Sequence, residues 1–161
     1  MKKLLSFTVV LISISFISCG GGSAPLSPKA FNETAISIFQ GANKILDTFD
    51  AKITAGVKSN DFASIINAAE SASTEIDAQI EKINAVIAPQ GGEDYKEAVL
   101  KTLNTTKSII ETGKKYGELQ EGYSNSEFNA LEKEYNSKRT QLSNELKDVG
   151  KAASAFLKAT K

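Results

Sequence analysis

The chain has 161 residues with 19 basic and 19 acidic side chains, and it contains no histidine, no tryptophan and a single cysteine. This balanced charge argues against a nucleic-acid-binding protein, which would carry a basic face, and against strong attraction to anionic lipid. Without histidine the chain can form neither a Ser-His-Asp triad nor an imidazole metal site. We therefore expect a protein that is not an enzyme and that needs no metal or cofactor.

The first eighteen residues have the layout of a secretory signal peptide. Lys2 and Lys3 form a basic start, and residues 4–17 form an apolar run that serine and threonine interrupt. This run is shorter than the roughly 20 apolar residues that a membrane-spanning helix needs. We expect residues 1–18 to be removed, which leaves 143 residues, 17 basic and 19 acidic side chains, and a net charge of −2. That length suits one domain.

Cys19 directly follows the apolar run and precedes a glycine-rich stretch. The sequence Phe16-Ile17-Ser18-Cys19 resembles the lipobox of bacterial lipoproteins, in which the cysteine is diacylated and becomes the new N-terminus. It departs from that pattern at Phe16, where leucine is usual. The resemblance implies lipidation of Cys19, of the palmitate type, which also removes a free thiol. The alternative is an ordinary signal peptide followed by an unrelated cysteine.

The lipid implies a location in the cell envelope. Two or three acyl chains hold a protein firmly on a membrane, at about 0.8 kcal/mol per buried CH₂. Gly20 follows the cysteine in place of the aspartate that resembles an inner-membrane retention signal. We therefore expect the outer membrane, with the leaflet left open. Residues 19–26 are the lipidated cysteine and a flexible tether, and residues 27–161 are the folded domain.

The first helix begins at Ser27 and Pro28, an N-cap followed by proline at the first helical position. Its apolar side chains recur every three or four residues, which is typical of an amphipathic helix. Gly56 is expected to loosen its end. The apolar stripe comprises Phe31, Ala35, Ile38, Ala42, Ile45, Phe49, Ile53 and Val57.

Three more helices follow with short breaks between them. Residues 59–61 separate the first helix from the second, and residues 89–92 form the strongest interior break. Ser124 and Glu127 form a capping box that begins the fourth helix. The apolar stripe of the second helix includes Phe62, Ile65, Ala69, Ile76 and Ile83. The stripe of the third helix includes Tyr95, Val99, Leu103, Ile109 and Ile110. The stripe of the fourth helix comprises Phe128, Leu131, Tyr135, Leu142, Leu146, Val149, Ala153 and Phe156.

Long helices joined by short breaks predict an all-α fold, an up-down-up-down four-helix bundle with coiled-coil-like packing. The alternative is two long hairpins that pair only when the chain dimerises, so an oligomer remains open. The acidic residues fall off the apolar stripes, which argues against a buried metal site. Glu93, Asp94 and Glu97 cluster near a turn, and a solvated helix start explains them better than a weak cation site.

Two features are candidates for contact with other molecules. The polar middle of the third helix, residues 102–108, either lines a groove or forms the outward face, and the outward face is the simpler interpretation. Four tyrosines near the ends of the third and fourth helices are candidate partner contacts. The alternative for them is core packing with the hydroxyl at the rim. These tyrosines are Tyr95, Tyr116, Tyr123 and Tyr135.

The domain resembles a family of small all-helical bacterial surface and outer-membrane lipoproteins of unknown function. Two stretches carry the resemblance: Phe31-Asn32 leading into Ile36, Gln40 and Ile45, and Gly92-Glu93-Asp94-Tyr95-Lys96 leading through Val99, Leu103 and Tyr116. The resemblance implies location and fold, and it transfers no catalytic residue.

We expect a non-catalytic binding or structural module of the cell envelope, held on the membrane through Cys19 and meeting another envelope or surface protein. The alternative is a hydrolase or small-ligand carrier that uses Glu, Lys and Tyr groups near the third helix. Two or more buried carboxylates or tyrosines converging on a pocket there would favour the alternative.

Overall fold

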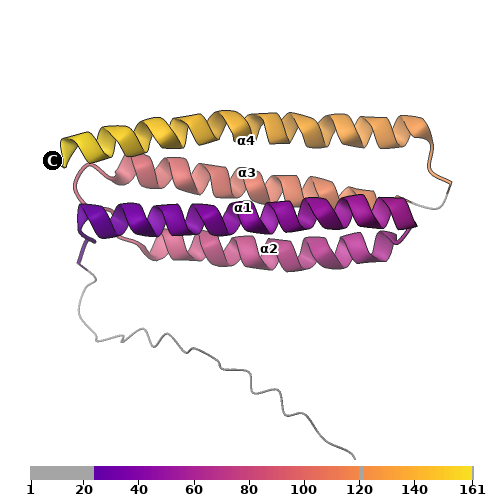
Figure 1. Cartoon of the computed structure of the whole chain (residues 1–161), viewed down its shortest axis with the longest axis horizontal. Coiled ribbons are helices and arrows are strands. Elements are labelled where there is room, and N and C mark those ends of the chain that lie inside the picture. The colour runs from indigo at the N-terminus through magenta and orange to yellow at the C-terminus, as the bar shows by residue number, and fades with distance from the viewer. Residues whose placement is uncertain (1–23, 120–121, 161) are drawn as a thin grey trace, which may run out of the picture.

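The structure is a computed structural model that describes residues 24–119 and 122–160. It has four helices: α1 (Pro28–Ser59), α2 (Phe62–Ala85), α3 (Glu93–Gly117) and α4 (Asn125–Ala159) (Figure 1). The predicted all-α four-helix bundle is confirmed. The predicted signal peptide, Cys19 and the first residues of the tether lie outside the described residues. Within those residues, no helix is long and apolar enough to span a membrane.

The helices begin and end where local chemistry satisfies their free backbone groups. Ser27 accepts a hydrogen bond from the Ala30 amide at 3.2 Å, and Ser124 and Glu127 form the expected capping box. Asn60 ends α1 in the left-handed conformation with φ 55°. Lys96 donates from α3 to the carbonyl of Val86 at 2.6 Å, just past the end of α2. These contacts make the breaks between helices short.

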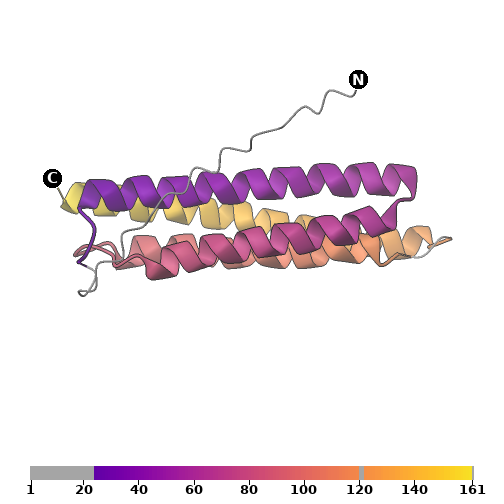
Figure 2. The same ribbon diagram turned by 90° about the horizontal axis from the view of Figure 1, so that it is seen from below.

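Consecutive helices run antiparallel, so the ends of the bundle differ. The start of α1, the α2–α3 connection and the end of α4 share one end, which we call the tether end (Figure 1). The α1–α2 turn and the α3–α4 connection share the far end. Figures 1 and 2 together place α2 and α4 on opposite sides of α1 and α3, which pack on each other. The helices therefore pack within one chain, without the dimerisation that paired hairpins would require.

The apolar core is concentrated among α1, α2 and α3. In α4 only three apolar side chains are buried, Leu131, Leu142 and Phe156. In the other helices the fully buried set includes Phe31, Phe49, Ile65, Ile76, Ile83, Val99, Leu103, Ile109 and Ile110. The other apolar side chains of α4 that pack against the core are only partly buried, so polar contacts add to the attachment of this helix.

Three glycines mark close approaches between helices. A Cβ on Gly56 would lie 2.5 Å from Ile65 Cγ1, and one on Gly113 would lie 2.5 Å from Phe49 Cε1. On Gly117 it would meet the Phe62 carbonyl oxygen at 2.8 Å. The expectation that Gly56 loosens the end of α1 is wrong: this residue is buried and lets α2 approach.

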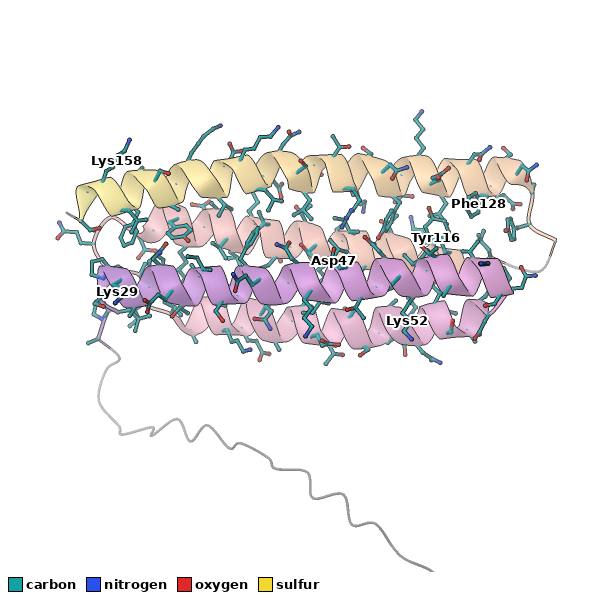
Figure 3. The ribbon with its side chains drawn as sticks, viewed as in Figure 1. Lys29, Asp47, Lys52, Tyr116, Phe128 and Lys158 are labelled. Atoms are coloured by element: carbon teal, nitrogen blue, oxygen red, sulfur yellow. The ribbon has the colours of Figure 1, made fainter. Side chains whose placement is uncertain are left out.

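Aromatic clusters close both ends of the bundle. At the tether end, the Phe31 ring makes edge contacts with Tyr95 and Phe156, at centroid distances of 5.5 and 5.4 Å. At the far end, Tyr116 packs against Phe128 at 5.6 Å, and both are labelled in Figure 3. These contacts attach the two ends of α4 to the rest of the bundle.

Candidate functional site

The middle of the α3–α4 contact is polar, unlike the rest of the bundle core. Thr102, Thr105, Thr106 and Thr112 of α3 are all buried. The interpretation of residues 102–108 as an outward face is therefore wrong for Thr102, Thr105 and Thr106, whereas Asn104 is exposed. The Thr102 hydroxyl donates to the Val99 carbonyl at 2.7 Å, and Thr106 donates to that of Thr102 at 2.9 Å. The backbone of α3 therefore satisfies the hydroxyl groups of Thr102 and Thr106 without a partner from α4.

The fourth helix contributes three long polar side chains to this region, Lys138, Gln141 and Glu145. Lys138 donates from Nζ to Ser108 Oγ at 2.6 Å. Gln141 donates from Nε2 to Thr105 Oγ1 at 3.4 Å and to Glu145 Oε1 at 3.0 Å. The two helices are thus joined here by side-chain hydrogen bonds rather than by apolar packing.

These side chains border an open hollow of about 590 Å³, which we call the α3–α4 groove. Its wall on α3 comprises Glu97, Leu100, Lys101, Asn104, Thr105 and Ser108, and its wall on α4 comprises Lys138, Gln141 and Glu145. It carries two carboxylates and two ammonium groups, so its formal charges balance. The middle of the groove offers amides and hydroxyls.

Glu145 is the unusual member of the groove. The residue is only 6% exposed, although it carries a carboxylate. Its Oε1 accepts from Gln141 and lies 3.7 Å from Lys101 Nζ, beyond hydrogen-bond distance. Its Oε2 is buried and has no hydrogen-bond partner among the described residues. The expectation that acidic residues fall off the apolar stripes is wrong at Glu145, and a buried oxygen without a partner is costly.

An ion pair joins α3 to α4 beside the α3–α4 groove, on the side toward the far end of the bundle. Lys115 Nζ donates to both oxygens of Glu134, at 2.9 Å each. This hydrogen bond, together with the nearby charges of Lys115 and Lys138, lowers the pKa of the Glu134 carboxyl. The pair anchors α4 on α3 next to the groove without entering it.

None of the four predicted tyrosines lines the groove. Tyr95, Tyr116 and Tyr123 lie toward the two ends of the bundle, whereas Tyr135 is ten residues into α4. Tyr95 and Tyr116 are buried, so core packing describes them. Tyr135 is partly buried, and its hydroxyl donates to Asp50 of α1. Tyr123 is partly exposed and stacks on Phe128 with centroids 5.8 Å apart. Partner contact stays a prediction, and Tyr123 and Tyr135 are the two that are not fully buried.

The acidic cluster near the Gly91-Gly92 turn does not form a ligand set. Within residues 24–119 and 122–160, no three His, Cys, Asp or Glu side chains are placed to hold a metal ion. Glu93, Asp94 and Glu97 are exposed at the start of α3. Of these, only Glu97 borders the α3–α4 groove.

The predicted site residues did not include Lys138, Gln141 and Glu145, although the spacing of core-facing positions in α4 points to two of them. Core-facing positions of α4 recur at alternating steps of four and three residues, from Leu131 through Tyr135 to Leu142 and Val149. Lys138 and Glu145 occupy the intervening core positions. A charged residue at such a position is a sign of a polar site inside a bundle.

Comparison with known proteins adds no relative: the chain matches no family model, no curated protein and no solved structure.

Proposed function

We propose that this protein is a lipid-anchored lipoprotein of the bacterial outer membrane that acts as a non-catalytic binding module and holds its ligand in the α3–α4 groove. The observation that carries the binding role is Glu145, a residue of the groove wall. Its carboxylate is buried and has one oxygen without a hydrogen-bond partner among the described residues. A fold selected for stability alone favours an apolar side chain there. Retaining a charge at this cost is typical of a functional site.

The length of the tether supports a module held on a membrane by one end of the bundle. Residues 20–26 between Cys19 and the domain reach about 25 Å when fully extended. The groove begins near Glu97, close to the start of α3, and continues to Ser108, roughly 17 Å along the helix at 1.5 Å per residue. An acylated Cys19 would therefore hold the tether end near the bilayer and leave the groove open along the side of the bundle.

The same groove is also the best place for a hydrolase that uses Glu and Lys groups. Acid–base hydrolysis by carboxylates commonly needs two, one with a perturbed environment. Among the described residues of the groove wall, Glu145 is buried, Glu97 is exposed and no tyrosine is present. This pattern favours binding over turnover. An unbiased substrate screen on the purified protein tests it, since sustained turnover that Glu145→Gln abolishes would replace the binding proposal.

The membrane anchor is tested with Cys19→Ala. This change should move the protein from the detergent phase to the aqueous phase of a phase-separation assay and abolish incorporation of labelled palmitate. A matched control is Ser23→Ala, which leaves the cysteine intact. Unchanged partitioning of Cys19→Ala would contradict the lipoprotein assignment.

The binding role is tested by photo-crosslinking in intact cells. A photoreactive residue at Asn104, in the groove, should add the mass of a bound small molecule to the protein, whereas one at the exposed Lys147 should not. A photoreactive residue at Tyr123 tests contact between the far end and another envelope protein. Equal labelling from positions 104 and 147 would contradict a ligand site in the groove.

A further inference from the structure

We propose that the α3–α4 groove binds a small zwitterion, a free amino acid or short peptide, whose ammonium group pairs with Glu145 and whose carboxylate pairs with Lys101. This inference rests on the proposed function, because it takes the groove to be a ligand site. It adds the chemical class of the ligand and assigns a role to each end of it.

Glu145 selects the ammonium group. Its carboxylate is held inside the α3–α4 contact, with Oε1 bonded to Gln141 and Oε2 unpartnered among the described residues. A primary ammonium offers three donors, which is enough to serve both a carboxylate oxygen and a neighbouring amide or hydroxyl oxygen. Pairing a buried charge recovers much of the cost of its desolvation. A neutral or anionic group at the same point recovers less or adds to the cost.

Lys101 is the side chain that the ligand displaces. Its ammonium lies 3.7 Å from Glu145 Oε1, too far for a hydrogen bond, and its side chain is 65% exposed. An exposed, flexible lysine held this loosely is easily released. Once released beside a ligand ammonium, it needs a negative partner nearby. A ligand that carries its own carboxylate supplies that partner, whereas a simple amine leaves two ammonium groups adjacent.

The remainder of the groove suits a neutral polar ligand. Lys138 is already held by Ser108 Oγ at 2.6 Å, so it is less available than Lys101. Between the charged groups lie Asn104, Thr105 and Gln141, whose amides and hydroxyl match peptide N–H and C=O groups. The balanced charge of the wall disfavours polyanions and polycations alike. A hollow of about 590 Å³ has room for a short peptide.

The test uses the full chain in detergent micelles and a pool of free amino acids and random tripeptides with free termini. Members of the pool retained by the protein are identified by mass spectrometry, and their affinities are then measured by calorimetry. The variants are Glu145→Gln, which keeps the shape and removes the charge, and Glu132→Gln, a matched control on an exposed part of α4. Helical circular dichroism verifies that each variant folds. Lys101→Met provides a second, independent variant at an exposed position.

We expect the protein and Glu132→Gln to retain the same peptides, and Glu145→Gln to lose affinity by about tenfold or more. N-acetylation of the peptide should cause a similar loss. C-terminal amidation should weaken binding to the protein but not to Lys101→Met, because the carboxylate and Lys101 act as a pair. Equal affinity for N-acetylated peptides, or undiminished retention by Glu145→Gln, overturns the proposal.

The proposal and the proposed function fail in different ways. Retention of nothing from the pool, with a small-molecule adduct at position 104 in cells, overturns the zwitterion and leaves the groove as a ligand site. Retention of nothing together with equal labelling from positions 104 and 147 overturns both.

Discussion

Tyr135 of α4 donates a hydrogen bond from its hydroxyl to Oδ1 of Asp50 of α1, and Arg139, one turn further along α4, places Nη2 3.2 Å from the other oxygen of that carboxylate. Arg139 is the single arginine of the chain. A guanidinium and a phenol thus converge from α4 on one half-buried carboxylate of α1. This contact fixes how α4 lies against α1, where apolar contact is sparse.

Asp50→Ala should lower the free energy of unfolding by about 1–3 kcal/mol, because it leaves the Tyr135 hydroxyl and Arg139 without their partner. Asp47→Ala is a matched control: Asp47 is exposed on α1 (Figure 3) and forms no ion pair within the part of the chain that the structure describes. Denaturant unfolding followed by circular dichroism measures both. Equal effects of the two changes would contradict the assigned role of Asp50.

The protein should lose stability in alkali through its buried tyrosines. Burial, and then the charge of Glu132, raises the pKa of Tyr116 to about 12, and burial with the hydrogen bond to Asp50 raises that of Tyr135 from 10.0. Above pH 10 the unfolded chain releases these protons before the folded chain does, so the free energy of unfolding falls as pH rises. Below pH 10 this contribution is fully present.

Unfolding measured from about pH 9 to about pH 12 tests this, with tyrosinate absorbance followed in parallel. Tyr135→Phe should be less stable at neutral pH but should show a shallower alkaline loss. An alkaline loss of stability that is equally steep in Tyr135→Phe would argue that other groups, such as the lysines, cause it.

Two glycine substitutions should have opposite signs. Gly117→Ala forces a methyl group against Ile66 Cγ1 at 2.6 Å and the Phe62 carbonyl oxygen at 2.8 Å, so we expect a loss of about 1–3 kcal/mol. Gly150 lies in α4, and its added Cβ would meet nothing within 4 Å. Gly150→Ala should therefore stabilise the protein by about 0.5–1 kcal/mol. Thermal unfolding measures both, and a stabilising Gly117→Ala would refute the close approach of α2 and α3.

Ile76→Asp should destabilise the bundle by several kcal/mol, because Ile76 is fully buried and an unpaired charge there has no partner. Its neighbour Glu75 is exposed, so Glu75→Ala should change the free energy of unfolding by less than about 0.5 kcal/mol. Denaturant unfolding compares the pair. Near-native stability of Ile76→Asp would place α2 differently from the structure.

Glu145→Leu should make the protein more stable by about 1–3 kcal/mol, because it removes a buried carboxylate with one oxygen that no described residue hydrogen-bonds. Glu132→Leu, at an exposed position of α4, should be close to neutral. A gain in stability combined with loss of ligand binding is the pattern expected when a site is maintained at a cost to the fold. A large loss of stability in Glu145→Leu would show that the carboxylate supports the bundle instead.

The helices and their ends were predictable because their signals are local. The caps at Ser27 and Ser124 and the breaks at residues 59–61 and 89–92 depend on side chains within a few positions of each other. The apolar stripes predicted the four helices of the bundle for the same reason, since periodicity is a property of each helix alone.

Tertiary structure decided what each polar residue faces. The burial of Thr105 and Glu145 depends on the contact between α3 and α4, which the pattern of neither helix shows by itself. Gly56 is a glycine near the end of a helix, and that position alone predicts a loosened end. It is buried instead, because Ile65 of α2 comes close to it. The sequence by itself determined where the helices form. Only packing determined that the Gln141 amide of α4 meets the Thr105 hydroxyl of α3, because that contact joins residues 36 positions apart.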